Sequence, residues 1–249
     1  MKSKIFNNVY PFTTEEIASY FPLLDLKEKN VLTVGSSSDQ AFNALLLGAK
    51  NITVYDINEN TARFGKLKKD IIVNTQSRRQ MYEKVLGIKE VPLSQDIFSF
   101  NSLKSMNTYM ASKNSYNKLR KLLSEESDKI SYIEGNIINI ESIKDKKYDV
   151  IITSNVLQYL DFFVPKGTSI EETLQGLFKK LKDHLTEKGV LQLFYYYSFT
   201  NSYMKKNSNS YTTTYLPWIV DTLSDDILYL DKFENSMGKK DAIVTYIKK

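Results

Sequence analysis

Short apolar runs alternate with amphipathic segments along most of the chain. Five apolar runs have the length of a buried strand, and they lie at residues 31–34, 51–55, 130–133, 148–154 and 190–195. Three segments carry apolar side chains three and four residues apart and predict helices, at residues 41–47, 60–72 and 169–185. Strands that alternate with helices indicate an α/β fold built on a mostly parallel sheet.

The alternation changes near the end of the sequence. Residues 227–233 and 242–247 form two further strand patterns joined by a short polar segment, which predicts an antiparallel hairpin. A dinucleotide dehydrogenase would continue the parallel βαβ rhythm instead. We therefore expect a seven-stranded sheet that is mostly parallel and has an antiparallel C-terminal hairpin.

A long interval, residues 73–129, separates the second predicted helix from the third strand. Connections in compact α/β units usually take roughly two to six residues. The interval has amphipathic patterns of its own, so we expect residues 76–125 to form a helical insertion, or cap, within a single domain spanning residues 1–249. The insertion would pack over the carboxyl edge of the sheet and help to build a pocket for the molecule on which the protein acts. A purely stabilising lobe is the alternative.

The first strand leads into a turn of small residues, Val-Gly-Ser-Ser-Ser-Asp-Gln at 34–40, and the second strand ends at Asp56. In doubly wound folds an acid at that strand tip accepts hydrogen bonds from ribose hydroxyls. A dinucleotide needs several glycines so that the backbone can approach a pyrophosphate, and this turn has only Gly35. A ligand with a ribose but no phosphate, such as S-adenosylmethionine, fits the turn better.

With this turn, this acid and the antiparallel last strand, most of residues 10–249 resembles the class I S-adenosylmethionine-dependent methyltransferases, apart from the insertion. The resemblance implies a Rossmann-like sheet and places the cofactor along its carboxyl edge. The implied cofactor contacts are Gly35, Ser36, Ser37, Asp39, Gln40, Asp56, Ile57, Asn136, Ile137, Asn155 and Val156.

The resemblance also implies individual roles in the turn. Backbone at Gly35 and Ser36 would face the methionine arm, and Asp39 would hold its ammonium group directly or through water. Asp56 would bind the ribose. Ser37 and Asp39 stand where the family usually has its second and third glycines, so the loop must follow a different path.

Three further positions follow the second, third and fourth predicted strands. The resemblance implies that Ile57 lines the adenine, that Asn136 contacts the adenine amino group, and that Asn155 faces the cofactor. Each asparagine could instead serve as a turn or cap residue.

A narrower similarity concerns the cofactor half alone. Residues 36–40, 45–49 and 56–58 resemble those of the betaine-lipid synthases, which transfer the 3-amino-3-carboxypropyl group of S-adenosylmethionine. A long helical insertion after the second strand is shared with them. Aminocarboxypropyl transfer is therefore the alternative to methyl transfer, and a non-catalytic cofactor-binding module is a third reading.

Residue usage restricts the chemistry. The chain has no cysteine, which excludes iron–sulfur radical chemistry and argues against a cysteine nucleophile. The single histidine, His184, is expected at a helix C-terminus, and no metal site is expected. Transfer from a sulfonium releases a neutral leaving group and depends mainly on placement. A phenol could still orient or deprotonate the acceptor, and the candidates are Tyr10, Tyr20, Tyr159 and Tyr195.

Charge and hydropathy bear on partners. The net charge is +5, and basic residues of the insertion that could contact phosphates are Arg78, Arg79, Lys118, Arg120 and Lys121. Acidic residues lie among them, and the Asn/Asp-Pro-Pro-aromatic signature of base methylation is missing at 154–157. These features favour a small-molecule or lipid acceptor over RNA. No apolar run approaches the roughly 20 residues of a membrane span, and a cytoplasmic protein is expected.

Overall fold

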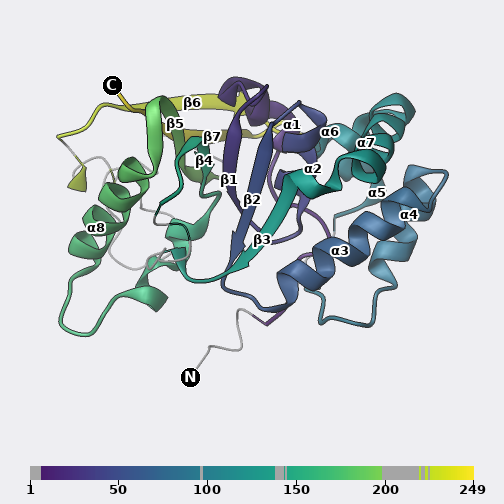
Figure 1. Ribbon diagram of the computed structural model, residues 1–249, viewed down its shortest axis with the longest axis horizontal. Helices are drawn as coiled ribbons and strands as arrows, with labels where there is room; N and C mark the ends of the chain where they lie inside the picture. Colours follow the sequence, from purple (N-terminus) through teal and green to yellow (C-terminus); the bar gives the residue numbers. More distant parts are fainter. Residues whose placement is uncertain are drawn as a thin grey trace. The chain divides into compact units, whose positions relative to one another are not determined.

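The computed structural model describes residues 7–95, 98–137, 143, 145–197, 219, 222–223 and 225–249. Within this part of the chain, seven strands form one sheet in the order β3-β2-β1-β4-β5-β7-β6 (Figure 1). The strands are β1 (Asn30–Val34), β2 (Asn51–Asp56), β3 (Ile130–Glu134), β4 (Tyr148–Ile152), β5 (Leu185–Tyr196), β6 (Leu228–Glu234) and β7 (Lys240–Ile247). Only pairs that involve β7 are antiparallel among the registered pairs, which confirms the predicted fold class.

The chain divides into two compact units, Met1–Ser142 and Ile143–Lys249. In the first unit β2 lies between β1 and β3, and all three are parallel. Tyr55 of β2 is in register with Val34 of β1 and Ile133 of β3, so the three strands end together. This common carboxyl edge is where the predicted cofactor residues of the first unit lie.

Two helices return the chain between these strands. Helix α2 (Asp39–Leu46) follows β1 and ends before Gly48, whose φ of 88° suits a residue without a Cβ. Helix α3 (Asn60–Val73) follows β2 and buries Phe64, Lys68 and Ile72, which are four residues apart and therefore share one face. The short elements α1 (Ile17–Tyr20) and η2 (Phe21–Leu24) precede β1.

Helices occupy the predicted insertion. They are α4 (Arg78–Leu86), α5 (Phe100–Met106), α6 (Thr108–Ala111) and α7 (Lys113–Glu125), followed by the single turn η3 (Ser127–Lys129). Ser77, Ser99 and Ser112 begin α4, α5 and α7 with a side-chain acceptor for a backbone N–H of the first turn. Helix α7 packs against α2 and α3 (Figure 1), and the contacts between elements show that α5 packs against α1. Most of the insertion therefore packs against the other helices of the first unit, α1, α2 and α3.

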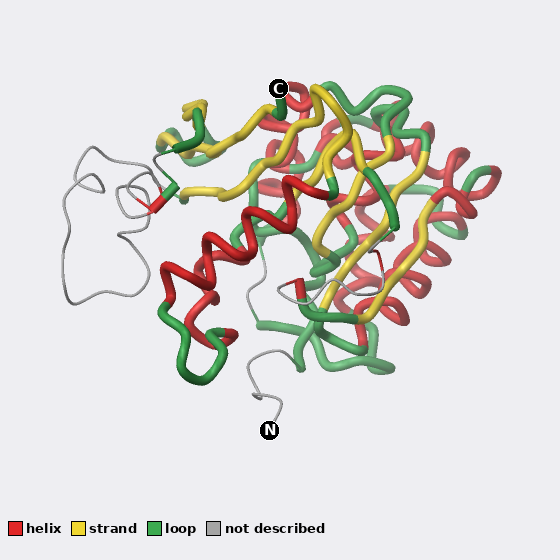
Figure 2. The backbone as a smooth tube through the Cα atoms, turned by 60° about the vertical axis from the view of Figure 1, so that its left-hand side comes forward, coloured by secondary structure: helices red, strands yellow, loops and turns green. Residues whose placement is uncertain are grey.

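In the second unit β5 lies between β4, to which it is parallel, and β7, to which it is antiparallel. Helix α8 (Ile170–Asp183) opens with a capping box formed by Ser169 and Glu172. Figure 2 shows α8 as one long straight helix, and the 3-10 helix η6 (Val156–Phe163) precedes it.

The boundary between α8 and β5 differs from the sequence prediction. Helix α8 ends at Asp183 with His184 as its C-cap, and β5 already begins at Leu185. Gly189 therefore lies inside β5, beside Lys188 with a φ of 61°. A register shift between Tyr148 and Val150 accommodates this irregularity. Among the described residues, no helix is long and apolar enough to cross a bilayer.

Candidate functional site

The turn after β1 crosses the tip of β2. The Gly35 N–H donates to the Tyr55 carbonyl at 2.9 Å, and the Ser36 N–H donates to Asp56 Oδ2 at 2.7 Å. A Cβ placed on Gly35 would lie 2.3 Å from Thr61 Cγ2 and 2.9 Å from Asp56 Cβ. The single glycine of the turn is thus required by close approach of β1 to β2 and α3.

Asp56 is half-buried at this edge, and its carboxylate is fixed from two sides. Besides Ser36, the Asn58 N–H donates to Oδ1 at 2.9 Å. Burial raises the pKa of Asp56, and the backbone N–H groups of Asn58 and Ser36 oppose that shift. Hydrogen bonds from Thr61 and from the Ile57 backbone also oppose the shift, so the carboxylate is held in one orientation at this edge.

The segment after β3 joins the same edge. The Gly135 N–H donates to the Asp56 carbonyl at 2.8 Å, which places Asn136 next in the chain to this contact. Asn136 and Ile57 are half-buried, whereas Ile137 is buried. The structure therefore brings Gly35, Ser36, Asp56 and Asn136 to one edge of the first unit.

The path of the turn departs from that of a glycine-rich loop. Ser36 and Ser38 have φ angles of 35° and 62°, a region that side chains other than Gly rarely adopt. The Tyr132 hydroxyl donates to Ser38 Oγ at 3.2 Å. Burial raises the pKa of Tyr132 to about 12, so this phenol stays protonated and acts as a donor at neutral pH.

Asp39, which was predicted to hold the ligand ammonium, has three partners within the protein. Its side chain is fully buried, and Oδ1 lies 2.6 Å from Lys68 Nζ and 2.5 Å from the Tyr109 hydroxyl. Oδ2 accepts the Thr13 N–H at 2.6 Å. A ligand ammonium would have to displace one of these donors. Ser37 and Gln40 are buried as well, and Ser36 is the one half-buried residue among residues 35–40.

Lys68 and Tyr109 were not among the predicted site residues. Sequence offers one signal for Lys68, since it lies four residues from both Phe64 and Ile72 on the face that α3 buries. Tyr109 gives no comparable signal, because α6 is a single turn within the insertion.

In the second unit Asn155 immediately precedes η6 and is half-buried, as is Val156. Its Nδ2 lies 3.4 Å from Gln158 Oε1 and from the Tyr197 hydroxyl, long distances that leave the amide weakly held. Ser154 before it has a φ of 57°, and its N–H donates to Gln192 Oε1 at 2.8 Å.

The four candidate tyrosines fall into two groups. Tyr20 and Tyr195 are fully buried, and their hydroxyls lie 2.7 Å from Glu15 Oε2 and 2.5 Å from Asp241 Oδ2. These contacts are interior hydrogen bonds, which makes both residues parts of the core. Tyr10 and Tyr159 are half-buried and retain access to solvent.

Comparison with protein-family models and with curated proteins finds no match. Comparison with solved structures finds three similar folds among others. The N-methyltransferase NodS from Bradyrhizobium japonicum WM9 in complex with S-adenosyl-L-homocysteine is 12% identical, over 92% of this chain and 85% of that chain, with a TM-score of 0.46. A putative S-adenosylmethionine-dependent methyltransferase from Listeria monocytogenes is 13% identical, over 94% and 98%, with a TM-score of 0.47. The O-methyltransferase from Bacillus cereus in complex with S-adenosylhomocysteine is 10% identical, over 91% and 78%, with a TM-score of 0.49.

Proposed function

We propose that the chain is an S-adenosylmethionine-dependent methyltransferase that acts on a small-molecule acceptor. The observation that carries the proposal is the pairing of Asp56 with the Ser36 N–H at the tip of β2. It holds a half-buried carboxylate beside a turn with one glycine, an arrangement suited to a ribose without a pyrophosphate.

The position of each residue indicates the part of the cofactor that it would bind. Backbone at Gly35 and Ser36 would bind the methionine arm, and Asp56 would accept from the ribose hydroxyls. Ile57 and Asn136, together with Ile137, would contact the adenine. The cofactor contacts of Asn155 and Val156, which belong to the second unit, stay predictions of the resemblance.

When bound, the sulfonium cofactor supplies an activated methyl group and leaves as a neutral thioether. The chain therefore needs to align the acceptor and exclude water more than it needs a strong base. A half-buried phenol, Tyr10 or Tyr159, would hold or accept the acceptor proton if the acceptor is not already nucleophilic.

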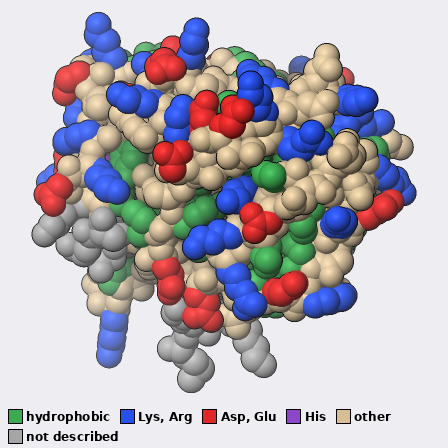
Figure 3. Space-filling model, turned by 45° about the vertical axis from the view of Figure 1, so that its right-hand side comes forward, with side chains coloured by type: hydrophobic (Ala, Val, Ile, Leu, Met, Phe, Trp, Pro, Cys, Tyr) green, Lys and Arg blue, Asp and Glu red, His purple; other side chains and the backbone are tan. Residues whose placement is uncertain are grey.

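The basic residues of the insertion bear on the class of acceptor. All five residues considered for phosphate contacts have a partner within the protein. These pairs are Arg78 with the Met110 carbonyl, Arg79 with Glu83, Lys118 with the Leu46 carbonyl, Arg120 with the Thr75 carbonyl, and Lys121 with Glu125. Basic and acidic side chains are interspersed on the face shown in Figure 3. A small-molecule acceptor therefore fits better than RNA. The experiment below also tests a lipid acceptor.

Aminocarboxypropyl transfer is the second candidate. The positive φ angles of Ser36 and Ser38 favour it, because a rearranged turn would hold the methionine arm differently and could present another carbon of the sulfonium to the acceptor. The narrower resemblance to the betaine-lipid synthases points the same way.

The by-product distinguishes these reactions without knowledge of the acceptor. The full chain would be incubated with S-adenosylmethionine and, in turn, with the small-molecule, lipid and RNA fractions of a cell extract. Enzyme-dependent S-adenosylhomocysteine with the small-molecule fraction is the expected result. Methylthioadenosine would establish aminocarboxypropyl transfer, and tight cofactor binding without either product would favour a non-catalytic module. Tighter binding of NAD than of S-adenosylhomocysteine would overturn the cofactor assignment.

A further inference from the structure

A buried ion pair lies directly behind the cofactor loop, defined as residues 35–38. Asp39 and Lys68 have side-chain exposures of 0%, and their charged atoms are 2.6 Å apart. Four separate segments meet there, because Thr13 and Tyr109 also donate to the Asp39 carboxylate. All of these residues belong to the first unit.

Lys68 uses the pair to hold the cofactor loop. Its Nζ donates to Asp39 Oδ1 at 2.6 Å, to the Ser37 carbonyl at 3.0 Å and to the Pro11 carbonyl at 2.8 Å, which accounts for its three protons. The ammonium also lies 4.5 Å from the centre of the Phe12 ring. The lysine thus binds the loop between β1 and α2 to α3 and to the N-terminal segment.

The loop needs such support because its backbone is strained. Ser36 and Ser38 occupy the left-handed region, where non-glycine residues persist only when their surroundings hold them. Ser37, which lies between them, is the residue whose carbonyl Lys68 binds. Loss of the Lys68 contact would therefore release the loop between its two strained positions.

Tyr109 connects this arrangement to the insertion. The hydroxyl of Tyr109, on α6, lies 2.5 Å from Asp39 Oδ1, the same oxygen that Lys68 contacts. Burial and the nearby Asp39 charge raise the pKa of Tyr109, so it remains a donor. Without this donor, Asp39 would be a buried carboxylate with one hydrogen bond fewer.

We propose that Tyr109 is a positioning residue through which the helical insertion holds the cofactor loop in its ligand-binding conformation, by way of Asp39 and Lys68. The inference rests on the proposed function in that Gly35 and Ser36 of this loop are taken to meet the cofactor. If the insertion contacted only the acceptor, its residues could be substituted without effect on cofactor affinity. The Tyr109 contact instead couples the insertion to the cofactor loop.

Tyr109→Phe tests the coupling, and Tyr116→Phe is its matched control. Tyr116 is also a buried insertion tyrosine, but its hydroxyl contacts Thr75 Oγ1 at 2.5 Å and the Ile72 carbonyl. In calorimetric titration of the full chain, Tyr109→Phe should weaken S-adenosylhomocysteine binding about five- to tenfold. Tyr116→Phe should change it by less than about twofold. Equal affinities of the two variants would overturn the coupling.

Amide hydrogen exchange of the ligand-free proteins provides a test that is independent of the cofactor. Exchange at residues 36–39 should be faster in Tyr109→Phe than in wild type and unchanged in Tyr116→Phe. If wild type fails to bind S-adenosylhomocysteine, the proposed function fails, and this exchange pattern still decides the coupling. A purely structural role would instead accelerate exchange equally in both variants, which would overturn the inference.

A third measurement covers the case in which Tyr109→Phe does not fold. In wild type, saturation with S-adenosylhomocysteine should slow exchange at residues 107–111 and leave residues 119–125 of α7 unchanged, because coupling is reciprocal. Unchanged exchange at residues 107–111 on binding would overturn the proposal.

Discussion

The Asp56 carboxylate accepts the Ser36 N–H at 2.7 Å, so the acid at the end of β2 and the turn after β1 form one rigid element. The Asn58 N–H holds the other oxygen of the same carboxylate. A ribose would meet a side chain that is already oriented, which reduces the entropy lost on binding.

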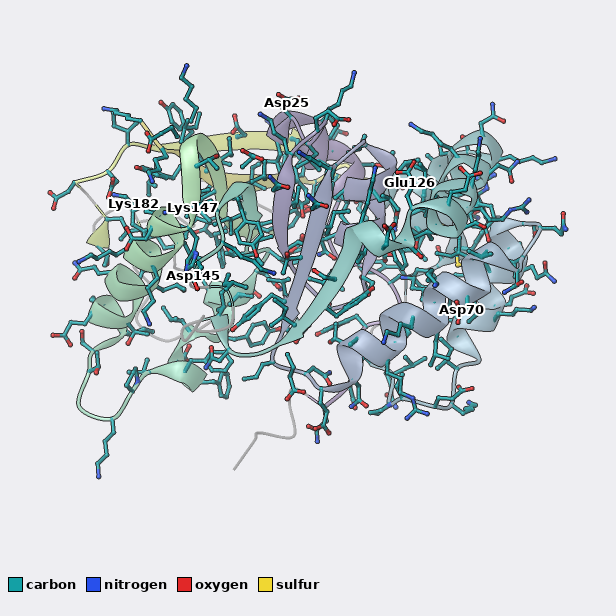
Figure 4. All side chains as sticks on the ribbon, in the orientation of Figure 1. Asp25, Asp70, Glu126, Asp145, Lys147 and Lys182 are labelled. Atoms are coloured by element: carbon teal, nitrogen blue, oxygen red, sulfur yellow. The ribbon has the colours of Figure 1, made fainter. Side chains whose placement is uncertain are left out.

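Replacement of Asp56 by alanine should weaken binding of S-adenosylhomocysteine by about 1–3 kcal/mol, the value of a lost charge-assisted hydrogen-bond pair. Calorimetric titration measures this change. Asp70→Ala is the control, because Asp70 lies on α3 with a side chain 64% exposed and should leave affinity unaltered (Figure 4). An unchanged affinity in folded Asp56→Ala would contradict the assignment of the ribose site.

Cofactor affinity should depend on pH through Asp56. Burial raises the pKa of this carboxyl above its ordinary value of 3.8. The ionised form is the better acceptor, so affinity should be full above the raised pKa and should fall as pH drops through it. Titrations at a series of pH values should show this loss beginning above the ordinary range, and Asp56→Asn should abolish it.

The raised pKa of Asp56 also fixes the direction in which folding stability changes with pH. A carboxyl whose pKa is raised on folding binds its proton more tightly in the folded state, so its contribution is present below the unfolded pKa. That contribution is lost as pH rises through the folded pKa. Urea unfolding of wild type and Asp56→Asn across this window should diverge, and parallel curves would show that Asp56 is not the titrating group.

Glycine substitutions should have opposite effects at two positions. Gly35→Ala places a methyl group 2.3 Å from Thr61 Cγ2 and 2.9 Å from Asp56 Oδ2, and should destabilise the fold by about 1–3 kcal/mol. Gly176→Ala, in the middle of α8 with no atom within 4 Å of the new Cβ, should stabilise it by about 0.5–1 kcal/mol. Urea unfolding measures both, and a neutral Gly35→Ala would disprove the close approach.

The Asp39–Lys68 pair should show strong coupling. Lys68→Met leaves a buried carboxylate without its counterion and should reduce the free energy of unfolding by about 3–5 kcal/mol. The double variant Asp39→Asn with Lys68→Met should be less destabilised than the sum of the single changes. The neighbour Lys69, whose side chain is 34% exposed, is the control, and Lys69→Met should change stability by less than about 0.5 kcal/mol. Additive effects in the cycle would rule out a direct interaction.

The sheet was predictable because each of its strands is a local apolar pattern bounded by turns. The position of Asp56 at the end of β2 was predictable for the same reason, and its role at a ribose stays a prediction. The predicted start of the fifth strand at residue 190 was wrong, because β5 begins at Leu185, where it pairs with Tyr148. Local pattern does not encode that pairing.

Asp39 has partners that sequence reasoning did not predict. A polar residue opening a helix beside a ligand loop looks like a ligand contact, yet its partners Thr13, Lys68 and Tyr109 lie 26, 29 and 70 residues away. Only the packing of the N-terminal segment, α3 and α6 around α2 brings them together. Such long-range contacts leave no periodic trace in a single sequence.

The position of β7 has a consequence for biosynthesis. Strand β7 lies between β5 and β6, although residues 240–247 are translated after both. Until they emerge from the ribosome, one side of β5 lacks its partner, including the apolar stretch Leu191–Tyr196. Unpaired apolar strands recruit other chains, so a nascent form of this protein would be prone to aggregation and a natural client of chaperones at that stage.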